Sequence, residues 1–153
     1  METRQYPVGS FGAVKPRYVN GVLVLPGVPR HVRTRLSAAQ LNAGATLLPA
    51  LPGFKYRMID AAAIAIGGNA ATSTGIDVLG TGAGSSRKIA SYKVAGLTQS
   101  TYLRAGTATN GIILADGASH TANDANTPVT VITDGSGLTG ATSVDILLTY
   151  VVE

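Results

Sequence analysis

Turn-forming residues divide this chain into short segments, and this punctuation limits the possible folds more than any other feature. From Leu47 onward, groups of Gly, Asn and Asp recur at roughly 10- to 15-residue intervals. The segments between them favour strands, namely 54–66, 75–79, 88–95, 101–105, 111–114, 129–133 and 143–152. Short strands separated by turn signals are typical of antiparallel sandwiches and jelly rolls. We therefore predict an all-β protein with an antiparallel, jelly-roll-like β-sandwich body.

Composition narrows the class further. The chain has 153 residues, which suits one domain with an appendage. Hydrophobic residues make up 45%, which excludes general disorder, whereas charged residues make up only 13%. Either much of the surface meets another surface, or Thr and Gly supply its polarity. There is no cysteine, so disulfides, thiolate metal sites and cysteine nucleophiles are excluded.

Location is indicated by what the sequence lacks. It has no run of 18 apolar residues, so we expect no membrane span. The N-terminal residues lack the apolar run of a secretory signal, so we expect synthesis and assembly in the cytoplasm.

Residues 1–35 differ from the remainder in proline content and charge. They hold four of the seven prolines, which disfavour helix and favour extended backbone. They also hold six cations against one acid, whereas residues 36–153 hold six cations against seven acids. We therefore expect an extended basic arm over 1–35 and a β-sandwich body over 36–153.

Two local elements have strong sequence signals. Asn20-Gly21 lies between Tyr18-Val19 and Val22-Leu23, a pattern typical of a type I′ hairpin. Ser37 and Gln40 form the capping-box pattern for a short helix over 38–43. Leu36 and Leu41 occupy the hydrophobic-staple positions, and Gly44 supplies the stop.

A weak internal echo links 71–79 with 141–147. Asp77 and Asp145 each lie between β-branched residues, hence on the opposite face of a strand. The echo indicates either two strands with similar surroundings or a chance similarity.

The familiar catalytic and nucleotide-binding motifs are incomplete. In Gly80–Ser86, Ser85 stands where a dinucleotide-binding loop needs its last glycine, so we expect a mobile loop between strands. His31 and His120 have no nucleophile elbow around any serine. We expect neither an enzyme nor a cofactor.

A polar segment contains Asp116, Asn123, Asp124 and Asn126. Their oxygens suit calcium, yet the EF-hand spacing and its closing glutamate are absent. Asx residues in loops more commonly cap turns. We favour turn caps and leave a cation open.

The arm carries the residues that we expect to make contact with a partner. Its aromatic residues lie among cations, which suits either nucleic acid or an acidic protein surface. The charge is sparse for nucleic acid, so we favour protein. The predicted contact residues are Arg4, Tyr6, Phe11, Lys15, Arg17, Tyr18, Arg30, Arg33 and Arg35.

Several sequence blocks from Leu36 to Glu153 resemble virion proteins of tailed bacteriophages, of the small head-decoration or cement type. They are L-S-A-A-Q-L-N-A-G, L-P-A-L-P-G-x-K-Y-R, A-N-D-A-N-T and V-D-I-L-L-T-Y-V-V-E. The resemblance implies a sandwich or jelly-roll body on the outer head surface of the virion. It also implies binding to the major capsid protein as a homo-oligomer, with a trimer favoured over a dimer.

The alternative function is host recognition by a tail-tip or fibre-associated protein. Its contacts would come from the loops at Gly80–Ser86 and Asp116–Asn126. A carbohydrate-active enzyme is disfavoured, because the sequence has no tryptophan platform for sugar stacking.

Overall fold

The computed structural model describes residues 17–19, 22–104, 112–114 and 122–153. Within them, eight strands form two antiparallel sheets. The three-stranded sheet has the order β3 (Arg30–Ser37), β10 (Ser143–Val152), β5 (Tyr56–Ile66). The five-stranded sheet has the order β4 (Ala45–Leu48), β9 (Val129–Asp134), β6 (Gly75–Gly82), β7 (Ser85–Lys93), β8 (Ile112–Leu114). The predicted all-β, sandwich-like class is confirmed, and the jelly-roll variant stays a prediction.

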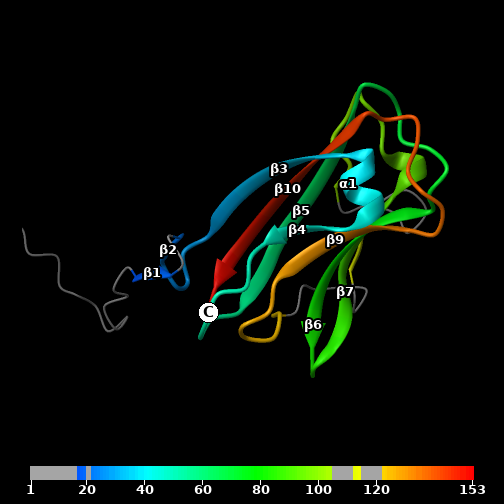
Figure 1. Cartoon of the computed structure of the whole chain (residues 1–153). Coiled ribbons are helices and arrows are strands. Elements are labelled where there is room, and N and C mark those ends of the chain that lie inside the picture. Colours follow the sequence, from blue (N-terminus) through cyan, green and yellow to red (C-terminus); the bar gives the residue numbers. More distant parts are fainter. Residues whose placement is uncertain (1–16, 20–21, 105–111, 115–121) are drawn as a thin grey trace, which may run out of the picture.

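Figure 1 shows β3, β10 and β5 as long strands running side by side, with α1 at one end of the body. The core draws on both sheets, and its fully buried side chains include Ile146 and Leu148 from β10 and Ile76, Val78 and Tyr92 from the other sheet. This arrangement follows from the period of two along a strand, which directs alternate residues inward.

A bulge in β5 changes which side chains of this strand point into the core. Tyr150 pairs with Met58, but the preceding Thr149 pairs with Asp60, so Ile59 has no partner in β10. Ile59 is 47% exposed, whereas Ala61 and the following odd-numbered alanines turn inward. The extra residue shifts the alternation by one position, which keeps apolar side chains in the core on both sides of it.

The two strongest local predictions are confirmed. Strands β1 (Arg17–Val19) and β2 (Val22–Val24) pair antiparallel, with Val19 opposite Val22. Helix α1 (Ala38–Ala43) begins with the predicted capping box, in which the Ser37 hydroxyl accepts from the Gln40 amide. Gly44 follows at a φ of 84°, and α1 connects β3 to β4.

Other expectations need correction. Segment 80–86 is no open loop, because β6 and β7 continue through it to a two-residue turn. Ala83 and Gly84 form that turn at φ values of 52° and 75°, which match a type I′ turn. In predicted strand 101–105, Leu103 makes only an isolated bridge with Ala63, and Ala105 lies outside the described residues. A one-turn 3₁₀ helix (Val94–Gly96) follows β7.

The expected boundary between arm and body at residue 35 needs correction. Residues 30–35 lie in β3, which pairs with β10 from Arg30 to Ser37 and therefore belongs to the body. Proline content and charge suggested an arm here, but the partner strand lies more than 100 positions further along the chain. No helix in the described part of the chain is long and apolar enough to cross a membrane.

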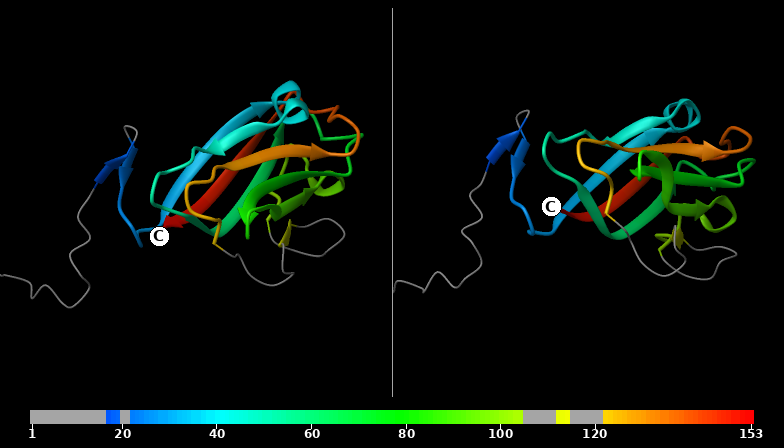
Figure 2. Two further views of the ribbon diagram at one scale, coloured as in Figure 1. Left: turned by 60° about the horizontal axis from the view of Figure 1, so that its bottom comes forward. Right: turned by 90° about the horizontal axis from the view of Figure 1, so that it is seen from below.

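The β1–β2 hairpin lies beyond the end of the body at which β10 finishes (Figure 2). Contacts of several kinds attach it to the body. Val24 is fully buried, the Gly27 amide donates to the Val152 carbonyl at 2.8 Å, and the Arg17 guanidinium lies 5.7 Å from the centre of the Phe54 ring.

Candidate binding surface

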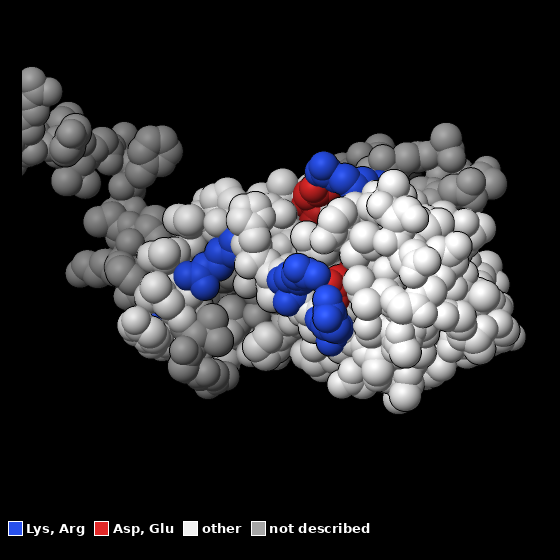
Figure 3. All heavy atoms as spheres, turned by 90° about the horizontal axis from the view of Figure 1, so that it is seen from above, with Lys and Arg blue, Asp and Glu red and all other residues white. Residues whose placement is uncertain are grey.

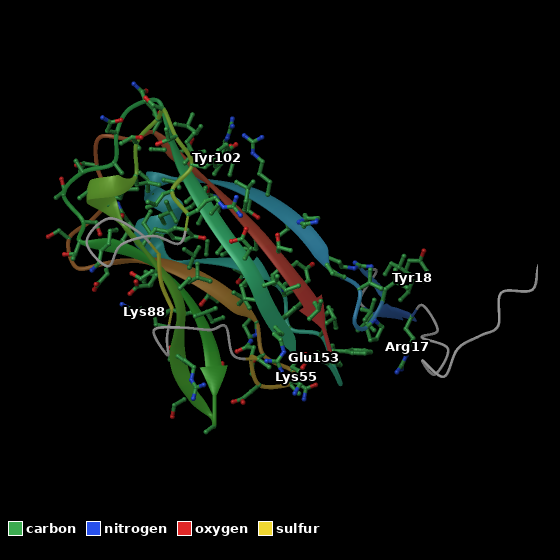
Figure 4. All side chains as sticks on the ribbon, turned by 180° about the vertical axis from the view of Figure 1, so that it is seen from behind. Arg17, Tyr18, Lys55, Lys88, Tyr102 and Glu153 are labelled. Atoms are coloured by element: carbon green, nitrogen blue, oxygen red, sulfur yellow. The ribbon has the colours of Figure 1, made fainter. Side chains whose placement is uncertain are left out.

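The structure separates the predicted contact residues into three groups. Arg4, Tyr6, Phe11 and Lys15 lie outside the described residues. Arg17 and Tyr18 lie on the hairpin, where Tyr18 is 76% exposed. Arg30, Arg33 and Arg35 lie on β3. The structure therefore brings Arg33 and Arg35 together, whereas Arg30 lies at the other end of β3. Arg17 and Tyr18 lie on the hairpin at the end of the molecule (Figure 4).

Arg33 and Arg35 converge on one carboxylate, that of Asp145 in β10. Arg33 donates to Asp145 through both Nε and a terminal nitrogen, with Nε at 2.8 Å from Oδ2. Arg35 donates through Nε to Oδ1 at 2.6 Å and through a terminal nitrogen to Oδ2 at 3.0 Å. Asp145 is fully covered, while the arginine side chains are 54% and 57% exposed. The two guanidiniums therefore form a lid over a carboxylate at the sheet surface.

This arrangement favours the charged form of the acid. Hydrogen bonding from Arg35 lowers the pKa of Asp145 to about 2, with further lowering from Arg33, against the opposing effect of burial. The same contact raises the pKa of Arg35. The three side chains together carry one net positive charge, so Asp145 compensates half of the positive charge that the two arginines bring to this surface.

An open groove of about 510 Å³ runs along the outer face of the three-stranded sheet beside this lid. Ala62 of β5 and Leu147 of β10 form its floor, since both are outward-facing residues at paired positions. Arg33 lines the β3 side, while Tyr102 and Arg104 line the groove from the segment that follows η1 (Val94–Gly96). The groove therefore has an apolar floor with a guanidinium on either side.

Polar contacts hold the groove's other side chains. Arg104 donates to Asp60 of β5, which is 39% exposed. His31 and Thr149 lie side by side, with 2.9 Å between the ring Nδ1 and the hydroxyl oxygen. Tyr102 is 47% exposed and lies beside β5 (Figure 4). Figure 3 shows that cations on the face seen there gather in small groups, some of them beside acidic side chains, on a largely uncharged surface.

The echo between Asp77 and Asp145 corresponds to similar surroundings. Asp77 of β6 is 7% exposed; Lys88 lies 2.7 Å from its Oδ2, and the Ser91 hydroxyl donates to Oδ1. Each aspartate is therefore shielded on its strand and neutralised by cations. The chain just before the second segment contacts the first, since Thr139 and Ala71 exchange backbone hydrogen bonds.

The polar segment acts as a set of turn caps where the structure describes it. Asn123 accepts from the Thr81 amide, Asp124 from the amides of Ala83 and Gly84, and Asn126 from that of Gly53. These side chains brace the β6–β7 turn and the loop before β5. Asp116 and His120 lie outside the described residues.

Several residues of this surface were missed by the sequence reasoning, namely the groove residues Asp60, Tyr102 and Arg104 and the covered Asp145. The sequence held two signals. The first is that Arg33 and Arg35 stand two positions apart, which places both on one face of a strand. The echo also marked Asp145 as an acid between buried neighbours. Only the pairing of β3 with β10 connects the two signals.

No known protein family, curated protein or solved structure matches this chain. The structure itself defines the class, an all-β domain of two antiparallel sheets with an attached N-terminal hairpin.

Proposed function

We propose that this protein is a decoration, or cement, protein that binds the outer surface of a tailed-phage head and stabilises the shell. Its partners are the major capsid protein and further copies of itself, with a trimer favoured. The proposal starts from the resemblance of the blocks after Leu36. Two of these blocks correspond to central structural elements, since L-S-A-A-Q-L-N-A-G spans the end of β3 with α1, and V-D-I-L-L-T-Y-V-V-E spans β10.

The observation that carries the proposal is the attached hairpin. It lies beyond the end of the body and is held there by Val24, by the Gly27–Val152 hydrogen bond and by Arg17 over Phe54. About three quarters of Tyr18 is exposed to solvent. Aromatic residues are favoured anchors in protein interfaces, and a hairpin held in place loses less entropy on binding than a free strand does.

The structure changes which cations take part in the proposed docking. Arg33 and Arg35 donate hydrogen bonds to Asp145, so their first role is to stabilise the three-stranded sheet. The electrostatic part of docking then rests on Arg4, Lys15, Arg17 and Arg30. Added salt weakens this part, because exposed charges are screened over about 10 Å at 0.1 M.

Occupancy of phage heads tests the proposal. Expanded heads that lack the protein are mixed with the full chain, with a variant lacking residues 1–16, and with Tyr18→Ser; bound copies are counted by electron microscopy. We expect full occupancy for the full chain and large losses for both variants. Ile132→Ser, which removes a 37% exposed side chain from the five-stranded sheet, is the matched control. Normal occupancy by both arm variants would refute docking through this segment.

Copy number separates the two candidate functions. Labelling the protein in intact virions should give hundreds of copies over the head if it is a coat component. A handful of copies at the tail tip would instead support the host-recognition alternative. That alternative has lost one of its expected loops, because segment 80–86 is a tight hairpin.

A further inference from the structure

We propose that the groove over the three-stranded sheet is a second docking site, which takes an extended segment of another protein carrying carboxylates beside apolar side chains. This site is separate from the hairpin and does not depend on the head-binding proposal. It is defined by the floor at Ala62 and Leu147 and by the guanidiniums of Arg33 and Arg104.

The guanidiniums of Arg33 and Arg104 can each bind a further carboxylate. A guanidinium has five N–H donors. Arg33 uses two on Asp145, and Arg104 uses one on Asp60. Each keeps donors for a ligand, while its own carboxylate holds it in place. Charge-assisted pairs between guanidinium and carboxylate are the stronger class of hydrogen bond, and fixed partners reduce the entropy lost on binding.

The balance of charge favours an acidic occupant. Arg33, Arg35 and Arg104 outnumber Asp60 and Asp145 around the groove. The apolar floor adds a preference for an aliphatic or aromatic side chain next to the carboxylate. A basic segment would instead meet the guanidiniums of Arg33 and Arg104.

The shape favours a chain segment over a small molecule. Sites for small ligands usually bury most of the ligand surface. Here the floor is the face of a sheet, and Arg33, Arg104 and Tyr102 along the groove are each about half exposed or more. A segment lying along β10 can spread its contacts over the length of this open groove.

A second copy of this chain is a poor occupant. Among the described acids, all but Asp134 are engaged by cations or backbone amides of their own chain. The described part of a second copy would therefore offer few free carboxylates to the groove. The occupant that fits is a different protein.

Nuclear magnetic resonance titration of the full ¹⁵N-labelled chain tests the site. The probes are two blocked pentapeptides, one alternating leucine with aspartate and the other alternating leucine with asparagine. We expect the aspartate peptide to shift the amide signals of Ala62, Leu147 and Thr149. We expect the asparagine peptide to bind about tenfold more weakly or worse, because it cannot form charge-assisted bonds.

Substitutions test whether the groove arginines bind the aspartate peptide. Arg104→Gln, alone and with Arg33→Gln, should weaken aspartate-peptide binding by about fivefold and at least about tenfold respectively. Arg35 still covers Asp145 in the double variant, and the amide spectrum reports whether the fold is kept. Lys93→Gln, at the end of β7 in the other sheet, should leave binding unchanged.

Three results would overturn the proposal. They are the absence of groove shifts, equal binding of the two peptides, and groove shifts that depend on protein concentration without peptide, which would identify a second copy as the occupant. Since no phage head is present, failure here leaves the head-binding proposal standing, and the reverse also holds.

Discussion

Asp145 has no accessible surface although it lies on the outer face of its sheet, because the side chains of Arg33 and Arg35 cover it. Removing one partner of such a group costs more than the pair contributes, since the other charges remain without compensation. The contact matters for the fold as well as for charge. It joins β3 to β10 through side chains in addition to the backbone ladder.

Asp145→Asn should lower the free energy of unfolding by about 2 kcal/mol at neutral pH, which matches a pKa about two units below its usual value. Because the pKa in the folded state is depressed, the stabilisation is complete above about pH 4 and is lost as the pH falls through about 2. Urea unfolding of both proteins between pH 2 and 6 measures this. Asp60→Asn, at a more exposed carboxylate, should show a smaller effect. A pH-independent difference for Asp145→Asn would contradict the electrostatic account.

Substitution of Tyr92 should raise the free energy of unfolding, whereas substitution of Asp145 should lower it. Its ring is completely buried, and its hydroxyl has no hydrogen-bond partner among the described residues. Burial raises the pKa of this phenol, which shows how poorly the site accommodates charge. Tyr92→Phe should therefore raise the free energy of unfolding by about 1 kcal/mol, because it removes a buried group without a partner.

Tyr56→Phe is the matched comparison. The Tyr56 hydroxyl donates to the Pro49 carbonyl, so the same substitution should cost about 1 kcal/mol. Thermal or urea unfolding of the two variants measures both values. Equal destabilisation by both substitutions would mean that the Tyr92 hydroxyl has a partner after all.

At the scale of elements, the connections β5–β6 and β9–β10 approach each other closely. A Cβ on Gly140 would lie 2.3 Å from the Asn69 carbonyl oxygen, and one on Gly68 would lie 2.3 Å from the Gly140 carbonyl oxygen. Both contacts are with backbone, which cannot move aside by a change of rotamer. The two glycines therefore allow the β5–β6 and β9–β10 connections to approach each other backbone to backbone.

Gly140→Ala should cost about 3 kcal/mol, from a positive φ together with the overlap. Gly53 separates the two causes, because its φ of +80° nearly equals the +78° of Gly140 while nothing lies near its missing Cβ. Gly53→Ala should cost only about 1 kcal/mol. Chemical unfolding measures the difference, and similar values for the two variants would show that the close approach contributes nothing.

Elements whose signals are local could be predicted from the sequence, and elements whose partners are distant could not. The capping box of α1 and the Asn-Gly hairpin involve residues within a few positions of one another, and both are confirmed. Strand β3 was assigned to the arm, because its arginines resemble a solvated basic segment until Asp145 is placed beside them. The groove depends on the same pairing and on Tyr102 and Arg104, which carry no motif.

For the whole molecule, β10 is the strand on which the three-stranded sheet depends. β3 and β5 do not pair with each other, and each pairs with β10 over most of its length. Val144, Ile146 and Leu148 are almost completely buried. We expect the backbone amides of these three residues to be among the slowest to exchange with deuterium, and those of the β1–β2 hairpin to exchange much faster.

Hydrogen exchange followed by mass spectrometry measures this order. Helix α1 serves as an internal reference, because its capping box and the buried Leu41 give it intermediate protection. Rapid exchange of β10 would contradict the central role of this strand.

The position of β10 also has a consequence for biosynthesis. Its first residue is made roughly 80 positions after the end of β5, which at ribosomal rates corresponds to roughly 4–16 s. During that interval β3 and β5 are both present without the strand that joins them, and their apolar faces are open to wrong partners. Expression at a high level should therefore favour aggregation of nascent chains. Slower synthesis at lower temperature, or added chaperone, should increase the soluble yield.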